Sequence, residues 1–242
     1  MKQEGILSAK ELIAWKMNNG ALKVPIAPKH VIICPQQVLP TRFKSLWYKE
    51  ISGLMGRHVC IDSKNGIYLS TGWGVGGSAL VAVCEELYAL GTRDFILIGM
   101  AGRLTAELLE GDSFYATSAF RAEGTSQHYL PVNSPIIVDC PSEQYYDRLD
   151  QIGLSRGRFC STDAPFRETP DQVTAWTNES CTLVDMETAS LYAFAKSKGA
   201  HALSIGVGAD SLANGQWGKP KDLGSINSII RKTVFQVIDL LA

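Results

Sequence analysis

The sequence predicts an α/β protein whose β-sheet is mixed and strongly bent, and two observations lead to this prediction. In the first half of the chain, short apolar runs typical of buried strands alternate with a helical pattern, an order that favours a sheet with helices packed on it. The middle of the chain holds strand-like segments and short turns with little helical pattern, so a plain doubly wound sheet is not expected. Because no linker-like stretch interrupts the chain, residues 1–242 are expected to form a single domain, with residues 1–29 as an N-terminal helical extension.

Local signals justify each element of the first half. The Val/Ile run in residues 30–35 stops at a proline and predicts a strand, and residues 66–72 predict another. Residues 78–91 combine a serine start, apolar residues three or four apart and a terminal glycine, which together predict a helix. The apolar run of residues 95–99 then predicts a strand that ends in a glycine-containing loop.

That loop carries Gly99, Gly102 and Arg103. A glycine loop after a strand presents bare backbone N–H groups, and such groups often hold an anion. The run before the loop has no positive charge, however, and Met100 stands where a small hydroxyl residue would suit an oxyanion better.

Strand and helix patterns continue through the second half. Residues 181–199 run from a strand into a helix that ends at a glycine, and residues 225–242 predict a closing helix with Ser225 as its N-cap. The remaining strand-like segments are residues 113–124, 135–140, 157–166 and 201–212.

The composition narrows the classes of function. Apolar residues make up 45% of the 242, and the formal net charge is −1, so neither nucleic acid nor a membrane surface is an expected partner. No run approaches the roughly 20 apolar residues that span a bilayer, and the amino terminus lacks the apolar core of a signal peptide. The six cysteines show no CxxC spacing and are expected as buried, reduced thiols. These features together predict a cytoplasmic protein. Because the sequence contains no zinc or EF-hand spacing, no metal site is expected.

A glycine-rich turn offers one false lead. Gly72, Gly74 and Gly77 match the pattern GxGxxG between a predicted strand and a predicted helix, where such a turn can hold the pyrophosphate of a dinucleotide. The next predicted strand ends without an acidic residue to bind a ribose hydroxyl, and bulky Trp73 sits inside the turn. We therefore interpret the turn as close packing of a strand on a helix and keep dinucleotide binding as the lesser alternative.

Acidic residues follow several predicted strands. Asp185 and Glu187 flank Met186 where a strand passes into a helix, and helix N-termini favour carboxylates for electrostatic reasons alone. The chemical alternative is that Glu187 accepts hydrogen bonds from vicinal hydroxyls while Met186 forms an apolar ledge for a sugar. Asp210 ends the next strand, and ligands of α/β sheets bind at the carboxyl ends of strands, so these side chains are expected to converge on one site. The same rim is expected to include Gly99 and Asp163.

A series of spaced motifs begins near Val31 and continues to the C-terminus: STGWGVGGSALVAVCEELYALG, ILIGMAGRL, EGTSQHYLP, STDAPFRET, LVDMETASLYAFAKSKG and GADSLANGQW. In this order they resemble the nucleoside phosphorylase superfamily, and in particular its uridine-phosphorylase-like branch. The resemblance implies a three-layer α/β/α sandwich on a mixed, barrel-like β-sheet, and a homo-oligomer such as a dimer or hexamer. It also implies cleavage of the N-glycosidic bond of a nucleoside, without a metal or organic cofactor, and transfer of the pentosyl group to phosphate or, in nucleosidases, to water.

Carried over residue by residue, the resemblance implies roles for particular side chains. Met186 and Glu187 hold the ribose, and Glu187 and Asp210 are the expected catalytic residues. Asp210 matches the acid that protonates a purine leaving group in some members, whereas Arg167 would recognise a pyrimidine carbonyl, so the base stays open. A loop histidine such as His128 is also often an ordinary surface residue. The expected base-pocket residues are Phe166, Arg167, Thr125, Ser126 and His128.

The expected phosphate site departs from the family pattern. Leu97 stands in place of an arginine, Met100 in place of a serine or threonine, and Arg42 is displaced because no Gly-Asp-Pro follows the first strand. Phosphate recognition favours bidentate charged donors, which leucine cannot replace. Phosphorolysis is the leading expectation, hydrolysis the first alternative and non-catalytic nucleoside binding the second. The pocket for phosphate or water is expected to comprise Gly99, Met100, Arg103 and Arg42, with Arg57 or a neighbouring subunit as further sources of a guanidinium.

Overall fold

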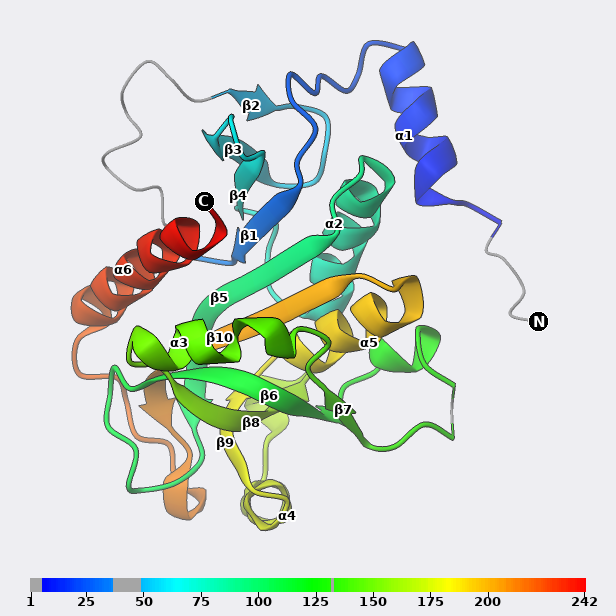
Figure 1. The fold of residues 1–242 in the computed structure, drawn as a ribbon. Coiled ribbons are helices and arrows are strands. Elements are labelled where there is room, and N and C mark those ends of the chain that lie inside the picture. Colours follow the sequence, from blue (N-terminus) through cyan, green and yellow to red (C-terminus); the bar gives the residue numbers. More distant parts are fainter. Residues whose placement is uncertain (1–5, 37–48, 132) are drawn as a thin grey trace.

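The computed structural model describes residues 6–36, 49–131 and 133–242, and its centre is a ten-stranded mixed β-sheet (Figure 1). Part of the sheet closes into a barrel, whose strands are β5 (Asp94–Arg103), β10 (His201–Ser211), β6 (Ser113–Ala122), β8 (Ser155–Thr162) and β9 (Cys181–Asp185). Each pairs with the next in that order, and β9 returns to β5. The β10–β6 and β9–β5 pairs are antiparallel and the others parallel, which confirms the expected mixed, barrel-like sheet.

From β5 the sheet continues as an open extension. It runs through β1 (His30–Cys34), β4 (Ile67–Thr71), β3 (Arg57–Asp62) and β2 (Glu50–Ile51), while β7 (Ile137–Asp139) adds to β6. The barrel itself is filled by side chains. A Cβ atom placed on Gly206 would lie 2.9 Å from both Leu183 and Phe159, so the barrel is a packed core and not a channel.

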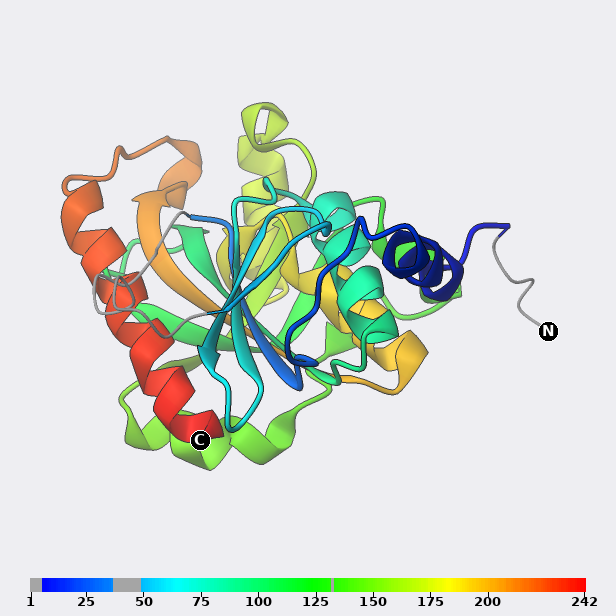
Figure 2. The same cartoon turned by 90° about the horizontal axis from the view of Figure 1, so that it is seen from above.

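Helices cover both sides of the sheet, as Figure 2 shows. On one side α2 (Gly77–Ala89) packs against α5 (Thr188–Lys198), and on the other α6 (Leu223–Leu241) packs along β5 and β10. This arrangement confirms the expected three-layer α/β/α sandwich. None of the described helices is long and apolar enough to span a bilayer. The shorter elements are α3 (Tyr146–Gln151), α4 (Pro170–Asn178) and the 3₁₀ turns η2 (Ser126–His128), η3 (Glu143–Tyr145), η4 (Pro165–Arg167) and η5 (Ala213–Gly215).

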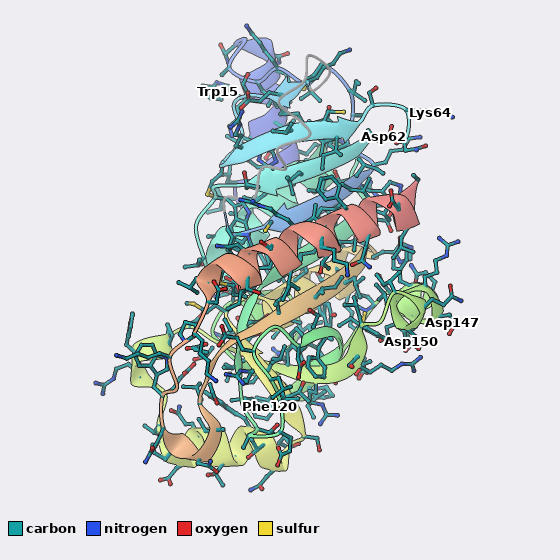
Figure 3. All side chains as sticks on the ribbon, turned by 90° about the vertical axis from the view of Figure 1, so that its left-hand side faces the viewer. Trp15, Asp62, Lys64, Phe120, Asp147 and Asp150 are labelled. Atoms are coloured by element: carbon teal, nitrogen blue, oxygen red, sulfur yellow. The ribbon has the colours of Figure 1, made fainter. Side chains whose placement is uncertain are left out.

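A helix also forms in the N-terminal segment, α1 (Ala9–Asn18). Ser8 and Glu11 form a capping box at its start, a common way to satisfy the first N–H groups of a helix. Ile13 is buried, and Lys16 pairs with Glu86 of α2, so α1 packs against the helix layer formed by α2 and α5. Trp15 projects from the opposite face of α1 and is 61% exposed (Figure 3).

The glycine loop predicted after residue 99 is wrong, because β5 continues as a strand to Arg103. Gly99 lies opposite Gly206 of β10, and Gly102 lies opposite Val184 of β9. Barrel closure supplies pairing partners on both sides of β5, so this backbone enters the sheet instead of forming an open anion cradle. The partners come from distant parts of the chain, which local sequence patterns do not show.

Two helix starts also differ from the sequence prediction. Asp222, not Ser225, caps α6: the Asp222 carboxylate accepts the Ser225 N–H at 3.0 Å, which places Ser225 inside the helix. Helix α4 was not expected. Its signal lies in Thr169 and Gln172, which form a capping box around Pro170 at the first helical position.

Candidate functional site

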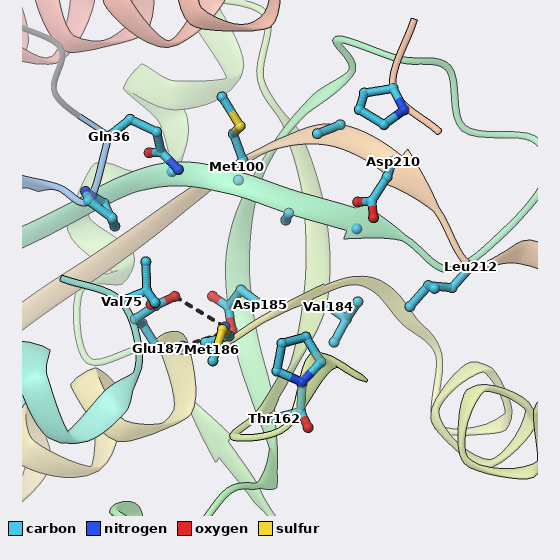
Figure 4. A pocket seen from close by; sticks show the side chains of 18 of the residues that line it. Gln36, Val75, Met100, Thr162, Val184, Asp185, Met186, Glu187, Asp210 and Leu212 are labelled. Atoms are coloured by element: carbon cyan, nitrogen blue, oxygen red, sulfur yellow. Dashed lines mark hydrogen bonds between the residues drawn. The ribbon is translucent and has the colours of Figure 1, made fainter. Parts of the chain in front are cut away.

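A cavity of about 330 Å³ opens at the carboxyl ends of β1, β5, β9 and β10, a volume suited to a small molecule. Figure 4 shows Gln36 and Met100 above Met186 and Glu187 on its left-hand side, and Asp210 and Leu212 on its right-hand side. Among the described residues, the lining contains four carboxyl side chains and no Lys, Arg or His. The carboxyl groups form two pairs: the turn acids, Asp185 and Glu187, and the rim acids, Glu168 and Asp210.

Asp185 ends β9 and is held by donors from three directions. Ser161 donates its hydroxyl proton to Oδ1 at 2.6 Å, and the Thr188 hydroxyl donates to Oδ2. The backbone N–H groups of Glu187 and Thr188 donate at 3.2 to 3.3 Å. Burial raises the pKa of Asp185, while these donors oppose that shift because they stabilise the ionised form. The result is a rigid turn between β9 and α5.

Glu187 follows in the same turn and is 7% exposed. Its carboxylate accepts the Gly76 N–H at 2.5 Å and the Met186 N–H at 3.1 Å. Burial, together with the negative charge of Asp185, raises the pKa of Glu187 to about 7. Glu187 and Met186 both line the cavity, next to each other, as the sequence predicts.

The glycine turn before α2 supports Glu187 from behind. Gly76, with a φ of +98°, turns its N–H toward that carboxylate. A Cβ atom on Gly77 would lie 2.1 Å from the Ser190 hydroxyl oxygen of α5, so α2 and α5 approach too closely for any larger residue. The GxGxxG pattern therefore serves close packing, the interpretation preferred from the sequence, although the partner of α2 is a helix as well as a strand.

Asp210 lies near the end of β10, on the rim of the cavity. The indole N–H of Trp217 donates to its Oδ2 atom at 2.8 Å. Gly102 is its neighbour across the sheet: a Cβ atom there would lie 3.3 Å from Asp210 Oδ1 and 3.0 Å from Val184. Asp210 and Trp217 thus line one side of the cavity, and Gly102 lines it beside Asp210.

Glu168, the second rim acid, was missed by sequence reasoning. It follows η4 and lines the cavity together with Asp210. Burial, together with the charge of Asp210, raises the pKa of Glu168 to about 7. The sequence offered no local signal, since a glutamate between an arginine and a helix N-cap is an ordinary surface pattern. Only the folded structure brings it beside Asp210.

The opposite side of the cavity is the one expected to hold phosphate or water. Gly99 and Met100 do line it, with Leu97, Pro35 and Gln36. The Arg103 side chain is occupied elsewhere: its Nε donates to the Asp210 carbonyl at 3.2 Å, and its Nη1 donates to the Leu108 carbonyl at 2.6 Å. Arg103 does not line the cavity, and Arg42 lies outside the described residues.

The residues expected to bind a base are more scattered. Phe166 and Arg167 lie exposed on η4, Phe166 with 97% of its surface accessible, and neither lines the cavity, although Pro165 beside them does. Ser126 is buried, and its hydroxyl accepts a hydrogen bond from Arg121 at 2.9 Å. An adjoining pocket, which shares Val75 and Met186 with the cavity, is lined by Thr125 and His128 and also by Asp163.

The fold and the site define an α/β barrel protein with an acid-lined small-molecule cavity at the strand ends. The sequence pattern of the phosphorylase superfamily matches residues 52–238, and the chain belongs to that family. This confirms the resemblance found in the sequence motifs.

Individual relatives are nucleoside phosphorylases of three kinds. The chain is 34% identical over 163 residues to a guanosine phosphorylase of Halorubrum lacusprofundi, a match that covers 63% of this chain and 64% of the relative. It is 28% identical over 177 residues to a DeoD-type purine nucleoside phosphorylase of Caldanaerobacter subterraneus subsp. tengcongensis, covering 70% and 74%. A uridine phosphorylase of Treponema pallidum is 41% identical over 66 residues, covering 27% and 26%.

Proposed function

We propose that this protein cleaves the N-glycosidic bond of a nucleoside. The observation that carries the proposal is the turn at Met186 and Glu187, which places a buried carboxyl group and an apolar side chain together on the wall of the cavity. Membership of the phosphorylase superfamily and the names of the similar proteins support the same reaction class.

The cavity suits the charges that develop in this reaction. As the bond to the base breaks, positive charge grows on the pentose ring and negative charge grows on the departing base. Glu187 would accept hydrogen bonds from the pentose hydroxyls and stabilise the positive charge, while Met186 supports the ring. Asp210 was expected at the base from the sequence, and it lines the opposite part of the cavity. Together these groups lower the barrier by electrostatic preorganisation.

We propose phosphate as the acceptor of the pentosyl group, because the similar proteins are named phosphorylases. The described cavity lining offers no cationic side chain for it. Phosphate binding would therefore draw on a guanidinium or ammonium group beyond that lining, such as Arg42 or a residue from a second copy of the chain.

Hydrolysis is the second candidate, and a specific observation favours it. Leu97, Met100 and Pro35 make the acceptor side of the cavity largely apolar, with Gln36 as its uncharged polar residue among those described, and the lining as a whole carries four carboxyl groups. Such a surface disfavours a phosphate dianion and admits water at no electrostatic cost.

The test is a nucleoside panel of guanosine, inosine, adenosine, uridine and thymidine in phosphate-free buffer, with and without added phosphate. Phosphorolysis is supported by base release that requires phosphate and yields a pentose 1-phosphate. Base release that ignores phosphate supports hydrolysis. If no nucleoside is cleaved but one of them raises the melting temperature, the protein is a nucleoside binder and the proposed reaction is wrong.

The same proposal extends to the assembly and the cofactor. We expect activity to survive extensive dialysis against a chelator, since the chemistry described above calls for no metal or organic cofactor. We also expect a homo-oligomer, a dimer or hexamer, to be seen by light scattering. The panel also tests the class of base. The expectation of a pyrimidine depended on Arg167 and on the segment GTSQHYLP, and because Arg167 is exposed, purine nucleosides are the first substrates to test.

A further inference from the structure

The rim acids differ from the turn acids in how their charges are satisfied. Within the described part of the chain, no donor reaches the Glu168 carboxyl group, whereas Asp210 accepts the Trp217 N–H at 2.8 Å. Glu168 is half-buried and lines the same cavity as Asp210, whose charge acts on it. A carboxyl group that is partly removed from water, and has no donor to stabilise its anion, favours the neutral form.

The charges around Glu168 reinforce this preference. Asp210 faces it from β10, and Cys160 lies near it on β8. The turn acids, Asp185 and Glu187, lie on another wall of the same cavity. Arg103 of β5, which contacts the backbone of Asp210, donates to the carbonyl groups of Asp210 and Leu108. Burial and the Asp210 charge raise the pKa of Glu168 to about 7.

We propose that Glu168 donates the proton to the departing base, and that the neighbouring Asp210 carboxylate favours the presence of that proton on Glu168. This inference rests on the proposed nucleoside cleavage and adds a catalytic residue to it. It also reverses the role that the sequence resemblance implied for Asp210, which becomes a positioning residue bound by Trp217.

The step balances without any further reagent. The bond between C1′ and the base nitrogen breaks, and its electron pair goes to the base. The proton on the Glu168 carboxyl group passes to a heteroatom of the base, which leaves neutral. An oxygen of phosphate or water forms the new bond to C1′, and Glu168 regains a proton from solvent before the next turnover.

The arrangement makes a clear prediction for pH. Because Glu168 must carry a proton, kcat/KM should fall as the pH rises above about 7. Replacing Asp210 by asparagine removes the negative charge that favours the protonated form. The fall in rate should then move to lower pH. If Asp210 were itself the proton donor, this variant would be slow at every pH.

The decisive experiment compares guanosine with 7-methylguanosine, whose base already carries a positive charge and leaves without receiving a proton. Glu168→Gln should lower kcat/KM for guanosine by about 10²- to 10⁴-fold, the usual range for a general acid, and leave 7-methylguanosine within about threefold of the wild type. Glu179→Gln, a change at an exposed glutamate outside the cavity, is the matched control and should leave both rates unchanged.

The outcomes separate this inference from the proposed function. If the wild type cleaves no nucleoside, the proposed function fails. If it cleaves them but Glu168→Gln slows both substrates equally, or neither, Glu168 is not the proton donor. Should the wild type accept pyrimidine nucleosides alone, the Asp210→Asn pH profile decides instead, and an unshifted profile overturns the proposal. A melting curve for each variant excludes simple unfolding.

Discussion

Two pairs of carboxyl groups face one cavity, and the protein holds them in different ways. Each turn acid accepts two backbone N–H groups: Asp185 from Glu187 and Thr188, and Glu187 from Gly76 and Met186. On the rim, Asp210 accepts one indole N–H, and no donor from the described residues reaches Glu168. Burial raises the pKa of carboxyl groups in both pairs, but within the part of the chain that the structure describes only the turn acids are held by backbone N–H groups.

The difference follows from the elements that carry each pair. Asp185 and Glu187 lie at the N-terminus of α5, where free N–H groups and the helix dipole stabilise anions. Glu168 follows a short 3₁₀ turn whose Phe166 is almost fully exposed. For a reaction that needs a carboxyl group held in place at the sugar and a transferable proton at the base, this division provides one of each.

Beside the loss expected for Glu168→Gln, the largest expected effect is on the turn acids. Glu187→Gln removes the charge that would stabilise the pentose cation, and kcat/KM should fall about 10²- to 10³-fold. The measurement is steady-state kinetics with the nucleoside best cleaved in the panel, and Glu179→Gln again serves as the control. Unlike Glu168→Gln, this variant should slow 7-methylguanosine as much as guanosine. Near-normal turnover would show that Glu187 does not bind the pentose.

The next expected effect is a loss of stability when the close contact between α2 and α5, next to the turn acids, is disturbed. Gly77→Ala places a methyl group 2.1 Å from the Ser190 hydroxyl oxygen and should lower the free energy of unfolding by about 1–3 kcal/mol. Urea denaturation measures the loss. Adding Ser190→Ala removes the nearest atom and should restore part of the stability, although its Cβ would still lie 2.8 Å away. No recovery in the double variant would mean that the contact is not the cause.

The smallest expected effect is on the floor beneath the rim acids. Gly102→Ala meets Val184 at 3.0 Å and Asp210 at 3.3 Å, so a small shift relieves it, and stability should change less than in Gly77→Ala. The added methyl narrows the cavity beside Asp210, and KM should rise about tenfold with little change in kcat. An unchanged KM would show that the substrate does not approach this wall.

Sequence patterns anticipated a good part of the site. Met186 and Glu187 were expected together because a strand passes directly into a helix there, and Asp210 was expected because it ends the next strand. Both predictions concern residues whose place depends on a nearby strand end. Phe166 and Arg167 were expected in the pocket by family resemblance, but both are exposed on η4. The cavity is lined instead by their neighbours Pro165 and Glu168.

By itself the sequence determined most of the strands and helices, the acidic turn before α5 and the family. These depend on local periodicity, caps and motif order, which a single chain displays directly. Tertiary structure alone decided that β5 continues through Gly102 as a barrel strand. It also decided that the Arg103 guanidinium donates to backbone carbonyl groups and that Glu168 lies near Asp210. Each of these requires residues far apart in the chain to meet, because burial and charge around a side chain depend on the neighbours that folding brings to it.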